Sequence, residues 1–286
     1  MTRVRVVTDS TASLDPEIVK DLDITIMPMQ IHVGGEIWEE TPDFDKEAFF
    51  RRMAHLSEPP RSEPLPVEAF VKTYEALGRS TDHILSLHGS SKLSDTCRVA
   101  REAAKPFWGC YEIAVMDSET TSVGLGILVK AAAEAAMEGQ SLDDITRLIR
   151  GMIPRIYVVF FVEKLDYLER KGRLRPAQAV LGTMLNIKPF ITMQDGELIP
   201  MEKVRTREKA VDKVFEFISE FSEIEQIAIL QSTLYPTEDT KALLERLDGI
   251  FPDLEVPIEV YGPTLASQLG LEALGVIVFE AETGFL

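Results

Sequence analysis

Residues 4–13 read Val-Arg-Val-Val-Thr-Asp-Ser-Thr-Ala-Ser, a short β-branched run that passes directly into hydroxyl and carboxylate side chains. The same succession of an apolar run and a polar segment recurs at 84–96 and at 113–122. A helical pattern follows each of the three, so the first half of the chain alternates strands with helices. This rhythm is typical of a parallel sheet with helices packed on its faces.

The hydrophobic periodicity of the first half predicts individual elements. Strands are expected at 4–8, 24–29, 83–87 and 112–116, with a hairpin at 32–39. Helices are expected at 15–21, 44–55, 67–77, 93–107 and 122–137. The last of these helices is apolar on nearly every side, so we expect it to be buried on most faces.

The second half has a different pattern. Asp195-Gly196 separates two apolar runs, as in a β-hairpin turn. Further strands are expected at 155–162, 227–230, 255–261 and 274–279, and helices at 165–170, 177–184, 207–221 and 237–247. We therefore predict a two-domain α/β protein. Residues 1–153 would form an α/β domain with hydroxyl-rich ligand loops, and residues 154–286 an α+β domain with a mixed or antiparallel sheet.

The composition excludes several classes of protein. The 286 residues are 45% hydrophobic and 27% charged, which are globular proportions. The net charge of −17 argues against general nucleic-acid binding, because polyphosphate would be repelled. No apolar run approaches the ~18 residues of a membrane span. The segment before Asp9 is too short for the apolar core of a signal peptide, so we expect a cytoplasmic protein.

The charge is unevenly distributed. Residues 155–207 carry ten basic and six acidic side chains, a local charge of +4 in a chain whose remainder carries −21. This basic segment fits a local anionic ligand, because arginine binds carboxylate or phosphate bidentately. It fits equally a solvated loop whose arginines pair with the surrounding carboxylates.

Hydroxyl-rich loops follow three of the predicted strands, at 8–13, 88–96 and 117–122. In an open parallel sheet such loops meet at the carboxyl ends of the strands, where ligands bind. Hydroxyls and backbone N–H groups at helix starts suit an anion, although the same residue types are ordinary helix caps. Three such loops at one edge predict a polar binding site there.

Signatures of catalysis are weak. The four histidines and two cysteines show no zinc-type or CxxC spacing, so no metal site is predicted. The Walker A, GxGxxG and GxSxG patterns are absent. One enzymatic alternative is phosphotransfer or hydrolysis with His88 as a base for Ser90 or Ser91. Otherwise we expect a protein that holds a ligand, with no catalytic residue and no cofactor.

Eight segments in order along the chain form a recognisable set: VVTDSTASL, PPRSEPLPVEAF, SSKLSDT, MDSETTSVGLG, LDYLERKGRL, TMLNIKPF, DGELIPMEKVRTREKA and GPTLASQLGLEALGV. With these segments the chain resembles, along almost its whole length, the DegV family of bacterial fatty-acid-binding proteins. The resemblance implies a long-chain fatty acid between two domains, with its carboxylate held by hydroxyls and its acyl chain in an apolar tunnel. It also implies a separate fatty-acid kinase that makes the acyl-phosphate.

The resemblance assigns the expected carboxylate contacts. Ser94, in Leu93-Ser94-Asp95-Thr96, matches the serine of the family's Leu-Ser-Gly-Thr motif and is the expected principal donor. The loop Arg61-Ser62-Glu63-Pro64 matches Thr-Ser-Gln-Pro, so that Arg61 replaces a threonine that contacts the carboxylate. The remaining contacts in this part of the chain are expected from Ser10, Ser90 and Ser91.

Three further positions complete the expected site. Arg173 and Arg205 match arginines that face the head group or the kinase. Gln268 stands where the family usually has a histidine. An amide still forms hydrogen bonds with a carboxylate, but it cannot carry a proton.

Overall fold

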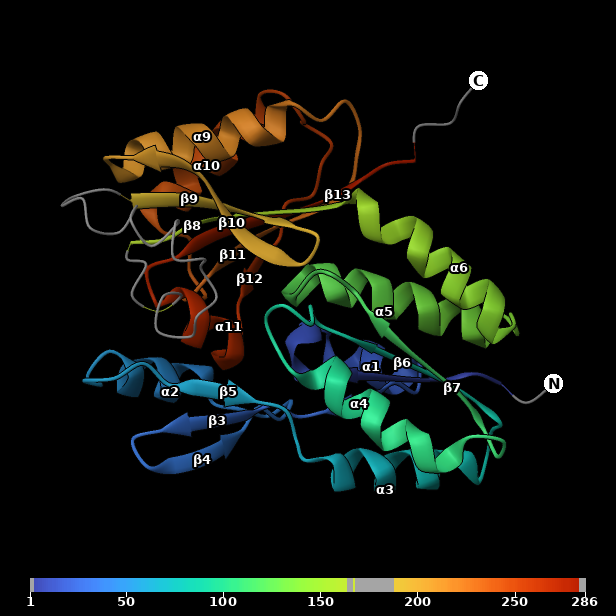
Figure 1. Cartoon of the computed structure of the whole chain (residues 1–286). Coiled ribbons are helices and arrows are strands. Elements are labelled where there is room, and N and C mark those ends of the chain that lie inside the picture. Colours follow the sequence, from blue (N-terminus) through green and yellow to red (C-terminus); the bar gives the residue numbers. More distant parts are fainter. Residues whose placement is uncertain (1–2, 164–166, 168–187, 283–286) are drawn as a thin grey trace. The chain divides into compact units, whose positions relative to one another are not determined.

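The computed structural model describes residues 3–163, 167 and 188–282, and the chain divides into two compact units (Figure 1). Unit 1 comprises Met1–Pro154 and Gly262–Thr264, and unit 2 comprises Arg155–Tyr261 and Leu265–Leu286. The helices predicted at 165–170 and 177–184 lie outside the described residues.

A four-stranded parallel sheet, sheet A, forms the centre of unit 1 in the order β2-β1-β6-β7. Its strands are β1 (Arg5–Asp9), β2 (Thr25–Met27), β6 (His83–His88) and β7 (Glu112–Asp117). The two central strands are buried over nearly their whole length, which explains their continuous apolar runs. The predicted parallel sheet is confirmed, and its order places the carboxyl ends of β1 and β6 next to each other.

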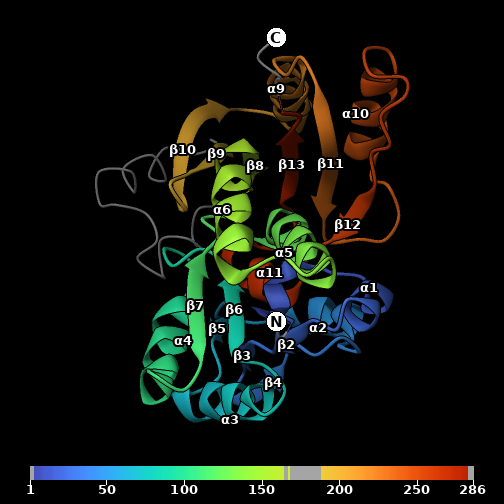
Figure 2. The same ribbon diagram turned by 90° about the vertical axis from the view of Figure 1, so that its right-hand side faces the viewer.

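Helices cover both faces of sheet A (Figures 1 and 2). On one face α3 (Val67–Gly78) and α4 (Thr96–Ala104) form a core with Val7 and Ile84. On the other face lie α5 (Ser122–Met137) and α6 (Leu142–Met152). The expectation for α5 is confirmed, since eleven of its sixteen residues are buried.

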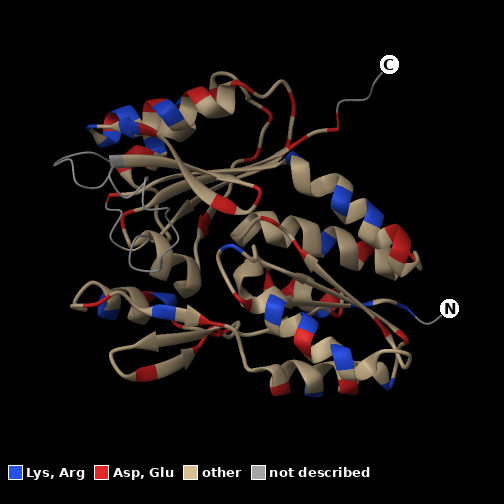
Figure 3. Ribbon diagram, viewed as in Figure 1, with Lys and Arg blue, Asp and Glu red and all other residues tan. Residues whose placement is uncertain are grey.

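Helix α6 is absent from the predicted elements, although its signals are present in the sequence. Ser141 caps it by accepting a hydrogen bond from the N–H of Asp144, and Leu142, Ile145 and Ile149 recur at helical spacing on its buried side. Its acidic residues stand in the first turn and its basic residues follow further along the helix (Figure 3). Among the described helices, none is both long and apolar enough to cross a membrane.

A small antiparallel sheet, sheet B, completes unit 1 in the order β4-β3-β5. Its strands are β3 (Gln30–Val33), β4 (Glu36–Glu39) and β5 (Arg61–Glu63). The predicted hairpin is confirmed: Gly34 and Gly35 have φ of 55° and 88°, as its tight turn requires. Strand β5 was not predicted, because three residues among prolines carry no alternation signal. The remaining elements are η1 (Ser10–Ala12), α1 (Pro16–Asp21), α2 (Lys46–Met53), η2 (Lys105–Phe107) and η3 (Ile153–Arg155).

Unit 2 is built on a six-stranded mixed sheet, sheet C, in the order β10-β9-β8-β13-β11-β12. Neighbouring strands are antiparallel except β11 and β12, which run parallel. The prediction of a mixed sheet is therefore confirmed. The elements are β8 (Ile156–Phe161), β9 (Lys188–Gln194), β10 (Glu197–Val204), α9 (Arg207–Ser219), β11 (Ile224–Gln231), α10 (Glu238–Asp248), β12 (Ile258–Val260), α11 (Pro263–Leu269) and β13 (Leu274–Glu280).

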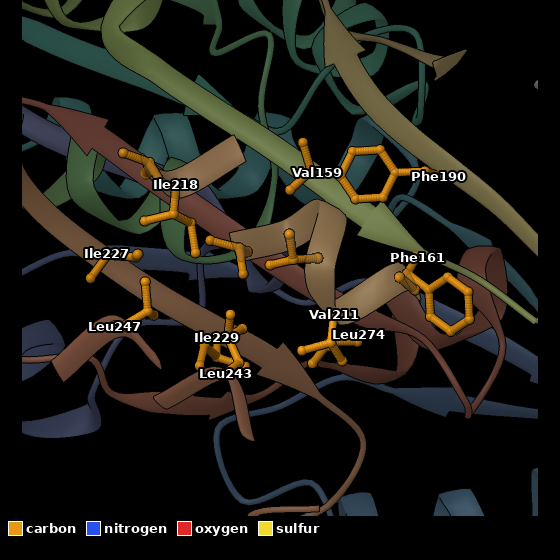
Figure 4. Close-up of a cluster of buried hydrophobic side chains, with 14 of the residues drawn as sticks. Val159, Phe161, Phe190, Val211, Ile218, Ile227, Ile229, Leu243, Leu247 and Leu274 are labelled. Atoms are coloured by element: carbon orange, nitrogen blue, oxygen red, sulfur yellow. The ribbon is translucent and has the colours of Figure 1, made fainter. Parts of the chain in front are cut away.

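The core of unit 2 lies between sheet C and the helices α9 and α10 (Figure 4). Val159 and Ile229 of the sheet meet Val211 of α9 and Leu243 of α10, and all four side chains are buried. Full burial of such side chains contributes roughly 1.5–3 kcal/mol each. The hydrophobic effect therefore stabilises the packing of each helix on the sheet, and polar contacts such as Lys213 of α9 with Glu202 of β10 and Thr240 of α10 with Gln231 of β11 add to it.

Close packing of α5 on η1 generates a first prediction. A Cβ at Gly126 would collide with the carbonyl oxygen of Ala12, and a backbone atom cannot rotate away. We expect Gly126→Ala to destabilise the protein by about 1–3 kcal/mol in urea unfolding. Gly151→Ala is the matched control, because this helical glycine of α6 faces open space. It should be neutral or stabilising by up to about 1 kcal/mol. Equal effects of the two changes would contradict the packing argument.

Candidate functional site

The three hydroxyl-rich loops lie at one edge of sheet A and hydrogen-bond to one another. Gly89 N–H donates to Asp9 across 3.1 Å, which joins the first loop to the second. Ser90 N–H donates to the carbonyl of Thr120 across 2.8 Å, which joins the second loop to the third. Ser90 is buried, whereas Ser91 is exposed and its N–H donates to the Asp117 carboxylate. The predicted convergence of the loops is therefore present in the structure.

Asp9 anchors the first two loops. Its buried carboxylate accepts hydrogen bonds from His88 Nδ1 at 3.0 Å, from Gly89 N–H, and from both the N–H and the hydroxyl of Thr11. Burial alone would raise the pKa of Asp9, but these bonds and the attraction of His88 lower it overall. All the donors come from the protein itself, so Asp9 organises the loops rather than contacting a ligand.

His88 extends this network into the sheet. Its Nε2 lies 2.7 Å from Ser86 Oγ, which in turn lies 2.7 Å from the hydroxyl of Tyr74 on α3. An Asp–His–Ser series has the composition of a hydrolytic triad, but Ser86 is fully buried. Both ring nitrogens of His88 are engaged, and their partners are neither Ser90 nor Ser91. The geometry thus offers no support for the enzymatic alternative.

Ser94 has a hydroxyl that pairs with Thr96 at the start of α4. Its Oγ accepts a hydrogen bond from Thr96 N–H at 3.2 Å and lies 2.7 Å from Thr96 Oγ1. Either hydroxyl of this pair can be the donor, and the Thr96 hydroxyl also donates to the Met29 sulfur at 3.5 Å. The half-buried Ser94 hydroxyl can therefore donate to Thr96 or turn its proton to an anion.

The hydroxyl of Ser10 forms a hydrogen bond with the carboxyl group of Glu40. Its Oγ accepts a hydrogen bond from Met29 N–H at 3.0 Å and donates to Glu40 Oε2 at 3.0 Å. The hydroxyl of Thr264 donates to the same oxygen at 2.5 Å. Glu40 is 5% exposed, and burial raises its pKa to about 7 despite these two bonds. Because its proton points at Glu40, Ser10 has no hydroxyl proton to offer a ligand in this arrangement.

Strand β5 brings the remaining predicted residues of unit 1 close to this group. Ser62 is half-buried opposite Ile31, and Arg61 is exposed opposite His32. The paired strand β3 begins immediately after Met29, whose Sδ lies 3.5 Å from Thr96 Oγ1. The segment around Met29 therefore links the positions of Ser10, Ser62 and Ser94.

The other predicted site residues belong to unit 2 or to the part of the chain without a description. Arg205 is exposed between β10 and α9. Gln268 on α11 is 3% exposed, and its Oε1 has no hydrogen-bond partner among the described residues. Arg173 lies outside the described residues. Leaving a buried acceptor unsatisfied costs about 1–3 kcal/mol, which makes Gln268 an unusual position.

Other arginines of the basic segment pair with carboxylates. Arg207 Nε lies 2.6 Å from Asp239, and its NH1 lies 3.1 Å from Glu163. Arg155 lies 2.6 Å from Glu225. For these two arginines the structure favours ion pairing within the protein over an anion site.

Two residues of this region, Glu40 and Thr264, are absent from the sequence prediction. Glu40 follows Glu36 and Glu39, which are exposed, and no local pattern distinguishes the buried acid from its neighbours. Thr264 is 224 residues away in the chain. Within the described ranges, no group of three His, Cys, Asp or Glu side chains is arranged to hold a metal ion.

Comparison with known proteins gives matches over nearly the whole chain. The profile of the DegV family, described as uncharacterised proteins, matches residues 3–281. The protein DegV of Bacillus subtilis is 30% identical over 276 residues, which cover 96% of this chain and 98% of that protein. The crystal structure of DegV from Bacillus subtilis, described as a fatty acid binding protein, has a TM-score of 0.86 at 29% identity and covers 98% of this chain and 100% of its own. A DegV family protein from Thermus thermophilus, whose structure is described as showing fatty acid binding, has a TM-score of 0.84 at 28% identity with the same coverage.

The anchoring role of Asp9 is testable by Asp9→Asn. The asparagine keeps the shape but turns an NH₂ group toward donors that need an acceptor, so buried hydrogen bonds are lost. We expect the free energy of unfolding to fall by about 2–4 kcal/mol in chemical denaturation. Asp15→Asn is the control, because Asp15 is an exposed helix cap at which asparagine is equally good. Similar losses for both variants would contradict an anchoring role.

The burial of Glu40 predicts that the stability difference between wild type and Glu40→Gln depends on pH. The pKa of Glu40 rises from 4.5 to about 7 on folding, so its contribution to stability is complete below pH 4.5 and is lost as the pH rises through 7. Glu40→Gln does not ionise, so relative to wild type it should be more favourable at pH 8 than at pH 5, by up to roughly 3 kcal/mol. Glu39→Gln, at an exposed site, should show no such dependence. A pH-independent difference for Glu40→Gln would refute the assignment.

Proposed function

The chain belongs to the DegV family, and we propose that it binds a long-chain fatty acid whose carboxylate is held by serine hydroxyls at the edge of sheet A. The observation that carries this proposal is the half-buried hydroxyl of Ser94, which the Thr96 N–H holds at the start of α4 beside the converging loops. An anion at that position would accept a hydrogen bond from the Ser94 hydroxyl. Two solved relatives above 25% identity, described as fatty acid binding, support the choice of ligand.

The neighbouring residues would complete the carboxylate site. Ser62 would contribute a second hydroxyl from β5, and exposed Arg61 would approach from solvent as a charge-assisted donor. Ser90 and Ser91 would shape the turn that carries Ser94. Gln268 would contribute a further polar contact through its side-chain NH₂ group, because its unpartnered Oε1 is an acceptor and cannot bond a carboxylate.

Most of the binding energy would come from the acyl chain. Each buried CH₂ contributes roughly 0.8 kcal/mol, so a chain of about 16 carbons outweighs any single hydrogen bond to the carboxylate. The hydroxyls would then orient the ligand and exclude uncharged lipids. This division of roles requires no catalytic group.

We further propose that the protein presents the acid to a separate fatty-acid kinase, which would form the acyl-phosphate. Arg205 supports this role, because it is exposed and therefore accessible to a partner. Arg173, which lies outside the described residues, is proposed for the same role from the family resemblance. A cytoplasmic location is proposed with this role, and the free thiols of Cys97 and Cys110 are compatible with a reducing compartment.

The proposal is tested by mass spectrometry of lipid extracted from purified protein, followed by uptake of added acid. We expect a bound acid of about 14 to 18 carbons. Ser94→Ala should weaken fatty-acid affinity by about 1–2 kcal/mol, roughly 5- to 30-fold, through loss of one hydrogen bond to a charged group.

Ser13→Ala is the matched control for Ser94→Ala. Its hydroxyl lies 3.2 Å from Ser122 Oγ and is not part of the proposed carboxylate site. Extraction that yields no fatty acid, together with no uptake of added acid, would defeat the proposed function. Equal effects of the two serine changes would defeat the assignment of Ser94 alone.

A further inference from the structure

The carboxyl group of Glu40 is buried inside unit 1, and both of its oxygens are in contact with neighbouring residues. Its backbone N–H donates to the Met29 carbonyl at 2.8 Å, which fixes the residue directly after β4. Its Oε2 accepts two hydrogen bonds, from Ser10 at 3.0 Å and from Thr264 at 2.5 Å. The backbone of Gly262 lies against Oε1, where a Cβ would collide with the carboxyl group. A glycine at 262 thus leaves room for this acid.

A short series of contacts joins this acid to the proposed carboxylate donor. Glu40 bonds Ser10, Ser10 bonds the N–H of Met29, and the Met29 sulfur lies 3.5 Å from Thr96 Oγ1. Thr96 is the residue that orients Ser94, with 2.7 Å between their hydroxyl oxygens. All of these residues belong to unit 1. The groups between Glu40 and Ser94 are thus contacting residues of one unit, most of them buried, so a negative charge at Glu40 would act on an anion bound at Ser94.

The charged surroundings of Glu40 do not neutralise it. Burial is the largest cause that raises its pKa to about 7, the charge of Asp9 raises it further, and Lys46 lowers it. His88 hydrogen-bonds Asp9 rather than Glu40. The titratable side chains on the adjoining strands are exposed or half-buried, and these are Glu36, Glu39, Arg61, Glu63 and His32. Glu36 pairs with Arg52, and His32 lies 3.4 Å from Glu63.

We propose that Glu40 is a head-group residue of the ligand site and that it takes up a proton from solvent when a fatty-acid carboxylate binds. This inference rests on the proposed fatty-acid binding. Two carboxylates that share a partly buried site raise each other's pKa, so the bound anion favours the protonated form of Glu40. The ligand keeps its charge, and the proton enters Glu40 from the buffer. Fatty-acid affinity therefore falls as the pH rises above neutrality.

Isothermal titration of delipidated protein with myristate measures this proton directly. Performed at pH 7 in buffers of different ionisation enthalpy, it gives the number of protons taken up per ligand. A rise of one unit in the pKa of Glu40 corresponds to uptake of ~0.4 proton at pH 7. We expect wild type to exceed Glu40→Gln by this amount, and Glu39→Gln to match wild type. Any proton exchanged by the fatty acid itself is common to all three proteins and cancels.

Thr264→Val provides a second variant that keeps the acid. It removes one of the two hydrogen bonds that favour ionised Glu40, so the pKa of Glu40 should rise and the pH of maximal proton uptake should shift upward. A merely structural role for Thr264 would weaken binding without moving that maximum. If Glu40→Gln binds no ligand, the shift in Thr264→Val decides the question.

The outcomes separate this inference from the proposed function. Myristate binding with equal proton uptake in wild type and Glu40→Gln, or with an unmoved maximum in Thr264→Val, would overturn the role of Glu40 and leave fatty-acid binding intact. Absence of myristate binding by every protein, wild type included, would overturn the proposed function and the inference with it.

Discussion

The hydrogen bonds accepted by the Asp9 carboxylate hold the edge of sheet A together. A buried anion that receives bonds from two loops fixes both, because breaking any one bond would leave a charge in a low-dielectric interior. The Ser90 turn, the Ser94 hydroxyl and the start of α4 all follow from the position of Gly89, which Asp9 sets. The polar edge is thus prearranged around an internal charge before any ligand is present.

Two buried carboxyl groups of unit 1, Asp9 and Glu40, have pKa values that shift in opposite directions. Asp9 has four donors and the attraction of His88, so its pKa is lowered. Glu40 has two hydroxyl donors, Asp9 as a nearby like charge and Lys46 as an opposing one, so burial prevails and its pKa is raised. The first group is therefore a fixed charge. The second titrates near neutrality, which suits a group whose protonation is coupled to an anionic ligand.

The strand–loop–helix order of the first half can be predicted from the sequence, because its hydrophobic periodicity and turn residues are distinct. The β-branched run at 5–9, the Gly34-Gly35 turn and the apolar α5 each carry a distinct periodicity or turn chemistry, and each matches the structure. Strand β5 cannot be predicted from the sequence, since its three residues become a strand only by pairing with β3. Helix α6 has both a cap and a helical period, so local signals are sufficient to predict it.

The sequence alone established the fold class, the family resemblance and the hydroxyl-rich strand ends, because these depend on local periodicity and on the order of motifs along the chain. It did not reveal how each hydroxyl is hydrogen-bonded. Ser10 and Ser94 are the same residue type in similar loops, yet the Ser10 hydroxyl donates to Glu40, whereas Ser94 Oγ accepts from the Thr96 N–H. Likewise, Glu40 differs from Glu39 only through burial against Thr264 and Gly262. Hydrogen-bond direction and desolvation arise from contacts between distant segments, so only the tertiary structure decides them.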